Sequence, residues 1–238
     1  HGTVFAPIHW TKQFASSARI DCLVGAAADP VSGQPELKAA PVSLKKFETK
    51  WHAFAVSRSR PAHAGAAYWA VAPAKAGWRV ELAGVEEPAD WAKHAATVLG
   101  LAENDRSELL AYHDAASGQH RFAAFAKDGR LLGALFVARE PVAVSRSWAA
   151  ERLNEIFEEP RQRYAYLAGR PGGAEKDRGA LVCACFEVGA NEISEAVTKG
   201  GCASVDAVGV ALKAGTNCGS CRAEIRRIVH DCRIKEAV

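Results

Sequence analysis

The 238-residue chain has no methionine, no long hydrophobic run and no block of like charges. The longest clean apolar run, LLGALFVA at residues 131–138, is far shorter than the roughly 20 residues that cross a bilayer. The first residues, HGTVFAPIHW, lack the charged start and apolar middle of a secretory signal. A formal net charge of +3 without a basic cluster is not typical of a nucleic-acid-binding tail. We therefore expect no membrane insertion and no nucleic-acid partner.

The absence of methionine extends to residue 1, which is His1. We interpret the chain as the C-terminal piece of a longer polypeptide. Its seven cysteines are an odd number and gather late in the sequence. Without a secretory signal, this pattern favours a reducing compartment, and metal or redox chemistry rather than a disulfide scaffold. A cytoplasmic location is the corresponding expectation.

The predicted fold class is α+β in several parts. Residues 1–50 are expected to be β-rich, with strands in GTVFAPIHW, ARIDCLVG and LKAAPVSLKKF around a structured DPVSGQPE loop. Residues 51–169 are expected to form a mixed α/β region. Within it, GWRVEL reads as a strand, and DWAKHAATVLG as a helix capped by Asp90 and closed by Gly100.

The strongest hairpin signal is RFAAFAKDGRLLGALFVA, in which Asp128-Gly129 fits a type I′ turn. Two short helices should follow, the first capped by Ser147 and the second ended by Gly169. Residues 170–179, RPGGAEKDRG, read as a linker because they combine proline, glycines and charges without an apolar anchor.

Residues 180–238 are predicted to form a small all-helical domain. Asn191 can cap EISEAVTK, Ser204 can cap VDAVGVALK, and GSCRAEIRRIVHD shows helical apolar spacing. A domain this small has a thin core and benefits from a metal that cross-links it.

Four cysteines in this last segment form two close pairs, Cys183-x-Cys185 and Cys218-x-x-Cys221. A helical hairpin that joins the pairs would offer four thiolates to one centre, either a zinc ion or an iron–sulfur cluster. A helix that starts near 218–219 would place its N–H groups and positive dipole end at the second pair. The glycines Gly215 and Gly219 would let backbone amides approach the sulfurs.

Spacing alone leaves zinc and iron–sulfur open, although C-x-C is tighter than the C-x₂₋₄-C usual for structural zinc. Cys22, Cys202 and Cys232 stand alone and are expected to be ordinary packed thiols. The histidines of the middle region show no ligand spacing and are expected to be surface or core residues: His52, His63, His94, His113 and His120.

The sequence VCACFEVGANEISEAVTKGG…ALKAGTNCGSC resembles the BFD-like (bacterioferritin-associated-ferredoxin) family of [2Fe–2S] domains. The likeness covers residues 180 to about 230 and includes the Gly-Thr-x-Cys-Gly-x-Cys turn. It implies that Cys183, Cys185, Cys218 and Cys221 ligate a [2Fe–2S] cluster. A zinc-binding structural or partner-docking module remains the alternative from another class.

The first segment, from GTVFAPIHW to DPVSGQPELK, resembles the end of the molybdopterin-dinucleotide-binding domain of molybdenum oxidoreductases. The nearest likeness is to the assimilatory nitrate reductase family, which joins such a segment to a BFD-like domain. YWAV, ELAG and YAYLAGRP follow in the expected order. On its own, the segment is also readable as the edge of a β-rich domain with a demanding loop.

The resemblance implies cofactor-binding residues in this segment. Lys38 matches a position that contacts the pterin cofactor, where a cation next to phosphate is favoured. Ile8 and His9 match positions that line the approach to molybdenum, and Gln34 is a polar neighbour of the cofactor. Ser17 stands where the family commonly has asparagine, and its hydroxyl replaces only one of the hydrogen bonds of an amide.

The resemblance implies the cofactors and partners of a reductase that converts nitrate to nitrite. The cofactors are the [2Fe–2S] cluster, molybdenum bis(molybdopterin guanine dinucleotide) shared with the upstream catalytic domains, and an upstream [4Fe–4S] cluster. The electron donor would be a flavoprotein NAD(P)H reductase, a ferredoxin or a flavodoxin. The piece itself would have no catalytic residue. Another redox enzyme with a BFD-like domain, such as a nitrite reductase large subunit, is the second alternative.

Overall fold

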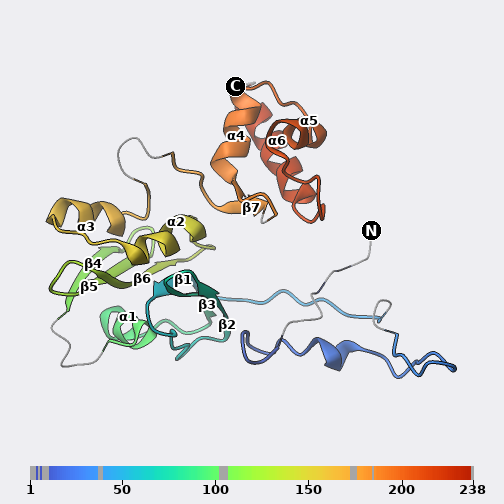
Figure 1. The fold of residues 1–238 in the computed structure, drawn as a ribbon, viewed down its shortest axis with the longest axis horizontal. Helices are drawn as coiled ribbons and strands as arrows, with labels where there is room; N and C mark the ends of the chain where they lie inside the picture. The colour runs from blue at the N-terminus through green and yellow to red at the C-terminus, as the bar shows by residue number, and fades with distance from the viewer. Residues whose placement is uncertain are drawn as a thin grey trace.

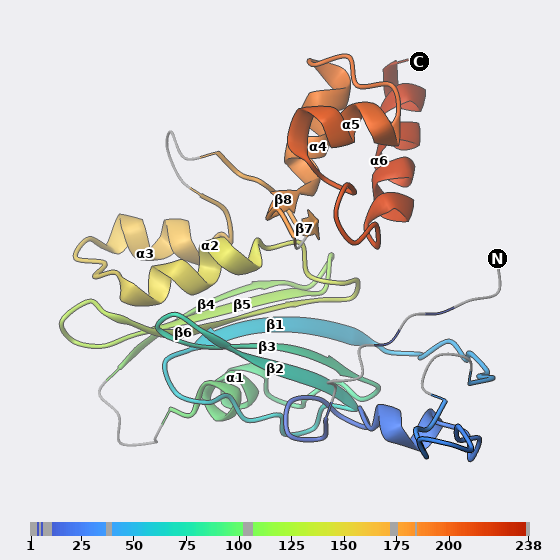
Figure 2. The same cartoon turned by 45° about the vertical axis from the view of Figure 1, so that its right-hand side comes forward.

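The computed structural model describes residues 4, 6, 11–36, 40–101, 107–171, 176–183 and 185–236. Figures 1 and 2 show a long first segment, a sheet flanked by helices, and a small helical unit at the C-terminus. This arrangement confirms the α+β class. None of the described helices is both long and apolar enough to cross a bilayer.

One six-stranded antiparallel sheet forms the middle of the chain. Its strands are β1 (Trp51–Ser57), β2 (Tyr68–Ala74), β3 (Gly77–Gly84), β4 (Glu108–Asp114), β5 (Gln119–Phe125) and β6 (Leu131–Ala138). Their spatial order is β2-β3-β1-β6-β5-β4. The two central strands, β1 and β6, are buried along almost their whole length. The apolar run LLGALFVA is therefore a strand covered on both faces, and the predicted GWRVEL strand is confirmed as β3.

Helices cover both faces of this sheet (Figure 2). Helix α1 (Trp91–Leu99) packs on one face, where Val98 and Leu99 join a core with Leu135. Helices α2 (Arg146–Glu151) and α3 (Pro160–Leu167) pack on the other, with a short 3₁₀ helix, η2 (Arg152–Asn154), between them. The predicted caps of α1 are confirmed, because the Asp90 carboxylate accepts from two amides and Gly100 ends the helix in the left-handed region.

The β5–β6 hairpin is confirmed, but its predicted type I′ turn is wrong. Gly129 has a φ of 82°, whereas Asp128 has no positive φ. The amide of Gly129 donates to the Ala126 carbonyl at 2.9 Å, so the turn runs over residues 126–129. The Phe157 amide in turn donates to the Gly129 carbonyl at 2.8 Å, and this contact from a later segment favours the longer loop.

The end of the second predicted helix is confirmed: α3 ends at Leu167, and Gly169 follows in the left-handed region. The predicted cap of the first is wrong. Ser145 caps α2, because its hydroxyl accepts from the Trp148 amide three residues later, and Ser147 lies inside the helix.

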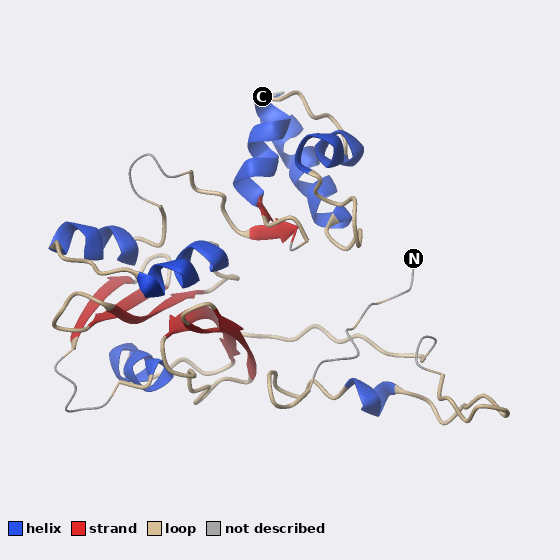
Figure 3. Cartoon of the chain, in the orientation of Figure 1, coloured by secondary structure: helices blue, strands red, loops and turns tan. Residues whose placement is uncertain are grey.

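The first segment corrects the prediction of a β-rich start. Residues 11–36 and 40–50 form no strand; they contain the 3₁₀ helix η1 (Ile20–Leu23) and loops (Figure 3). Most of these residues are exposed, so the alternation of ARIDCLVG covers no core. Local bonds replace strand pairing: Arg19 pairs with Asp21 at 2.6 Å, and the Asp29 carboxylate accepts from the amides of Val31 and Ser32. Most of GTVFAPIHW lies outside the described residues.

Residues 14–16 of the first segment nevertheless meet the edge of the sheet. The Ser16 amide donates to the Trp69 carbonyl at 2.8 Å, and the Val71 amide donates to the Phe14 carbonyl at 2.7 Å. Ala15 forms an isolated antiparallel bridge with Ala70. This contact covers part of strand β2, which is the edge of the sheet.

The C-terminal unit corrects the prediction of an all-helical domain. Three helices, α4 (Ala190–Thr198), α5 (Val205–Leu212) and α6 (Arg222–Glu236), surround their own core. A two-stranded ribbon of β7 (Leu181–Cys183) and β8 (Val188–Gly189) precedes them. Ser204 caps α5 as predicted, since its hydroxyl accepts from the Ala207 amide at 3.1 Å.

Asn191 does not cap α4, although the sequence predicts that it does. Gly189 precedes this helix, and its amide donates to the Glu192 carboxylate at 3.0 Å. The Asn191 amide group instead donates to the Asp177 carbonyl at 3.1 Å, outside the helix. The described residues of the predicted linker, 170–171 and 176–179, contain no helix or strand.

Gly84→Ala tests the packing of the sheet. Gly84 pairs with Trp51, and a Cβ at Gly84 would lie 2.3 Å from the buried Trp51 ring. We expect the free energy of unfolding to fall by about 1–3 kcal/mol, because the ring must move within a packed core. Urea unfolding followed by tryptophan fluorescence measures this. No tryptophan lies beyond Trp148, so the signal does not come from the C-terminal unit. Gly25→Ala is the control, because no atom lies within 4 Å of its added Cβ. Equal stability of the two variants would contradict the prediction.

Candidate functional site

Two loops of the C-terminal unit carry the four cysteines of the two close pairs. Cys183 ends β7 and Cys185 lies in the turn to β8, whereas Cys218 and Cys221 lie in the loop before α6. Cys183 is 2% exposed and Cys221 is 7% exposed, and both belong to the core of the unit. Cys185 and Cys218 are exposed. The four thiols that the sequence singled out therefore lie in these two segments, two in the core and two at the surface.

The four thiols meet as two pairs, each with one member from each loop. The Cys185 and Cys218 Sγ atoms lie 3.5 Å apart at the surface. The thiols of Cys183 and Cys221 hydrogen-bond to each other in the core. Among the described residues, no three or more His, Cys, Asp or Glu side chains are arranged closely enough to hold a metal ion as they stand. The arrangement is thus two plus two.

Backbone amides surround the buried pair. Gly215 makes a backbone hydrogen bond to each of Cys183 and Cys221, and the Phe186 and Cys185 backbones also hydrogen-bond to the Cys183 sulfur. Gly215 has a φ of 80°, a conformation that side chains other than glycine rarely adopt. The expectation that this glycine lets an amide reach the sulfurs is confirmed.

The pKa values of the thiols follow these contacts. Burial alone would raise the pKa of Cys183, but the hydrogen bonds from Gly215, Phe186 and Cys221 outweigh it and lower the pKa. Burial, together with the thiol–thiol hydrogen bond to Cys183, raises the pKa of Cys221. The Ser220 hydroxyl, followed by the Ser220 backbone and Cys185, lowers the pKa of Cys218 to about 7. One thiol in the buried pair and one in the exposed pair thus ionise more readily than a free cysteine.

Helix α6 begins at Arg222, later than the predicted start near 218–219. Cys221 lies directly before it, and its carbonyl accepts the Ile225 amide at 2.9 Å. Cys218 lies outside the helix, so its stabilisation comes from Ser220 and not from the helix end. Sequence reasoning missed Ser220; its only signal was its position inside Cys218-x-x-Cys221.

The three isolated cysteines differ from one another. Cys202 is buried in the C-terminal core and Cys232 packs against it, as predicted for ordinary thiols. Cys22 is exposed within the first segment's 3₁₀ helix, so the prediction of a packed thiol is wrong there. The strand predicted over ARIDCLVG, which would have buried Cys22, does not form.

The predicted pterin-contacting residues are only partly described. Ile8, His9 and Lys38 lie outside the described residues. Ser17 has a φ of 52° and lines a cavity of about 510 Å³ against strand β2. Gln34 lines a different cavity within the Asp29 loop. The structure does not place Ser17 and Gln34 in one pocket, and their cofactor contacts stay predictions.

Two histidines that the sequence left unconnected do meet. His113 and His120 face each other across β4 and β5, with their Nδ1 atoms 2.9 Å apart. The Trp91 ring stacks on His120 with centroids 4.9 Å apart. A seven-residue separation around a hairpin turn was the signal that could have revealed this pairing.

Ser220→Ala tests the electrostatics of the exposed pair. In the metal-free chain we expect the pKa of Cys218 to rise from about 7, since the Ser220 hydroxyl is the largest cause of its lowering. At neutral pH a smaller fraction is then thiolate, and alkylation by iodoacetamide becomes slower. Peptide mass spectrometry of Cys218 across a pH series measures the midpoint. Ser220→Thr keeps a hydroxyl and should keep the midpoint near that of the parent; an unchanged midpoint in Ser220→Ala would refute the assignment.

Comparison with known proteins finds relatives among nitrate reductases, nitrite reductases and nitrogen fixation proteins. The chain is 33% identical over 233 residues to a nitrate reductase of Klebsiella oxytoca, covering 96% of this chain and 25% of that protein. It is 27% identical over 146 residues to a nitrite reductase [NAD(P)H] of Emericella nidulans, covering 56% of this chain and 13% of the relative. It is 42% identical over 55 residues to the nitrogen fixation protein NifU of Leptolyngbya boryana, covering 23% and 27%.

The chain therefore spans about a quarter or less of the length of these relatives. Residues 181–231 match the family of BFD-like [2Fe–2S] binding domains. This segment begins at β7 and ends within α6, so it contains both cysteine loops. The chain thus combines a segment similar to the BFD-like [2Fe–2S] binding domains with a likeness, along 96% of its length, to part of a nitrate reductase.

Proposed function

We propose that this chain is the C-terminal portion of a molybdenum-dependent assimilatory nitrate reductase and that it relays electrons through a [2Fe–2S] cluster. The observation that carries the proposal is the meeting of four thiols, two from each loop, inside a BFD-like domain. Similarity to a nitrate reductase over 96% of the chain supports nitrate reduction as the activity of the whole enzyme.

The residues present fit such a cluster. A [2Fe–2S] cluster in a four-cysteine site takes four thiolates, two for each iron. Cys183, Cys185, Cys218 and Cys221 supply four thiols in two close pairs, and the pKa values of Cys183 and Cys218 are lowered toward the thiolate form that binds metal. The two pairs, Cys185 with Cys218 and Cys183 with Cys221, match the two thiolates that each iron of such a cluster takes.

When bound, the cluster supplies one-electron transfer. The chain's residues would set its environment: Gly215 directs an amide at the sulfurs of Cys183 and Cys221, and such hydrogen bonds help to set the reduction potential. The buried pair would shield one side from water. Cys185 and Cys218 would remain on the side from which an electron donor approaches.

In this proposal, reduction of nitrate to nitrite consumes two electrons and two protons and releases water. The reaction would take place at molybdenum bis(molybdopterin guanine dinucleotide) in the upstream catalytic domains, which would also hold a [4Fe–4S] cluster. Lys38, Ile8, His9, Ser17 and Gln34 would contribute to the pterin site from the first segment. A flavoprotein NAD(P)H reductase, a ferredoxin or a flavodoxin would be the cytoplasmic donor. The chain alone would relay electrons without reducing nitrate.

Single substitution of a proposed ligand tests the cluster. We expect Cys183→Ser, Cys185→Ser, Cys218→Ser or Cys221→Ser to remove most of the bound iron and acid-labile sulfide, because a [2Fe–2S] cluster needs four ligands. Iron, sulfide and zinc analysis of the anaerobically purified chain measures this. Cys22→Ser is the matched control, since Cys22 is exposed and lies in another part of the chain. A colourless parent protein with zinc and no sulfide would contradict the proposal.

A nitrite reductase is the second candidate, supported by the relative that aligns with 56% of this chain. We expect the native polypeptide that contains this sequence, purified from its source cells, to contain molybdenum and to reduce nitrate to nitrite with reduced methyl viologen. Nitrite that accumulates from nitrate and is not consumed supports the first candidate. A polypeptide that lacks molybdenum and reduces nitrite would favour the second.

A further inference from the structure

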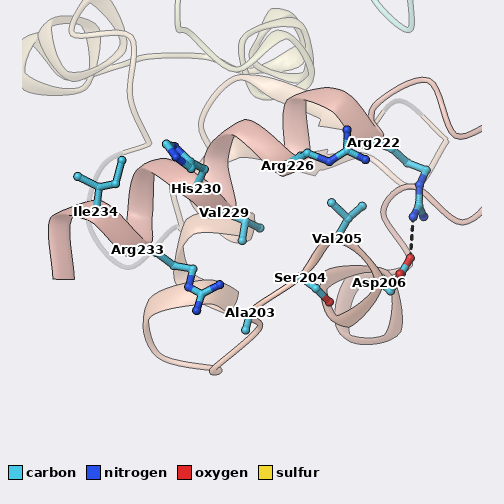
Figure 4. A pocket seen from close by; sticks show the side chains of 10 residues that line it. All are labelled: Ala203, Ser204, Val205, Asp206, Arg222, Arg226, Val229, His230, Arg233 and Ile234. Atoms are coloured by element: carbon cyan, nitrogen blue, oxygen red, sulfur yellow. Dashed lines mark hydrogen bonds and ion pairs between the residues drawn. The ribbon is translucent and has the colours of Figure 1, made fainter. Parts of the chain in front are cut away.

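A groove on the C-terminal unit is not used by the four thiols. It lies between the start of α5 and the outer face of α6, and has a volume of about 630 Å³ (Figure 4). Its walls are Ala203, Ser204, Val205, Asp206, Arg222, Arg226, Val229, His230, Arg233 and Ile234. The groove combines an apolar floor with a cationic rim.

The floor is the exposed edge of the domain core. Val205 and Val229 face each other between the two helices (Figure 4) and are buried members of the core. Ile234, five residues further along α6, is 52% exposed. Covering an apolar strip of this kind with a partner removes it from water, which favours binding.

The rim carries more positive than negative charge. Arg226 and Arg233 are exposed, and neither forms an ion pair with any residue whose side chain is described. Arg222 pairs with Asp206 at 2.6 Å, and Asp206 is the only acidic residue among the described residues that line the groove. By contrast Arg227, outside the groove, is neutralised by Glu224 and Asp231. The unpaired guanidinium groups therefore gather on the groove side of α6.

The groove also ends beside the thiols. Arg222 follows Cys221 directly, and its guanidinium donates to the Gly215 carbonyl at 3.5 Å. Gly215 is the residue whose backbone reaches both buried thiols. A protein seated in the groove would thus contact the loop that holds half of the proposed cluster ligands.

We propose that this groove docks the acidic face of a small electron-transfer protein that reduces the domain. The proposal rests on the function proposed above and names the residues of this chain on which the electron donor would dock. Carboxylates of the donor would pair with Arg226 and Arg233, while apolar side chains cover Val229 and Ile234. Cationic rims of this kind accelerate encounter with acidic partners and give small, polar, short-lived complexes. One electron leaves the reduced donor and enters the domain, and no bond forms or breaks.

Charge reversal of the rim tests the docking site, with an acidic flavodoxin as the probe. We expect Arg226→Glu/Arg233→Glu to weaken binding of oxidised flavodoxin about tenfold or more at low salt, as measured by calorimetry. The rate of reduction by flavodoxin hydroquinone in stopped flow should fall in parallel. High salt should reduce the difference, because exposed charges are screened. Lys199→Glu/Arg227→Glu carries the same change in net charge away from the groove and should bind like the parent.

Dithionite separates the two proposals. If it reduces the parent and both double variants equally, the cluster is intact and only docking has changed. A parent protein without a reducible cluster would contradict the proposed function. Calorimetry would still show whether flavodoxin binds in the groove. Equal weakening by both double variants, or no salt-dependent binding, would overturn the docking proposal. Self-association of the parent that Arg226→Glu/Arg233→Glu abolishes would show a contact between copies instead.

Discussion

The C-terminal unit depends on one constraint: two of the four thiols of its candidate site are also part of its hydrophobic core. Cys183 and Cys221 pack with Ile193 and Ile225, so the core and the candidate site form together. Cys183 is positioned by the β7–β8 ribbon and Cys221 by the start of α6. A short two-stranded ribbon is marginal alone, and packing against the helices fixes it. Loss of the core would therefore separate the thiols before any chemistry is affected.

The same logic explains the asymmetry of the four thiols. Cys185 and Cys218 protrude from their loops, and Ser220 and the neighbouring thiol contact Cys218. Cys183 receives its hydrogen bonds from backbone amides instead. Backbone donors are fixed by the fold, whereas a serine hydroxyl rotates. The buried side of the site is thus the more rigid, and the exposed side is the more open to a partner.

Local signals in the sequence predicted local structure well. Asp90, Gly100 and Ser204 mark helix ends through bonds that span only a few residues, and the structure has them as predicted. The cysteine spacing likewise identified the four thiols that meet. The prediction that Asn191 caps α4 failed because its side chain donates to the Asp177 carbonyl, a contact between residues 14 apart that local capping rules do not include. The strand predicted over ARIDCLVG did not form because alternating residues make a strand only where a core and a partner strand exist.

The contacts of residues 176–179 move the edge of the C-terminal unit. Lys176 pairs with Glu195 at 2.5 Å, the Asp177 carbonyl accepts from Asn191, and the Arg178 carbonyl accepts the Asn191 amide at 3.0 Å. A Cβ at Gly189 would lie 1.9 Å from that Arg178 carbonyl, so the two backbones are packed together. These residues belong to α4 and its surroundings as much as to the link before them. An excised domain that starts at residue 180 would lose these contacts with α4, whereas one that starts at residue 176 would keep them.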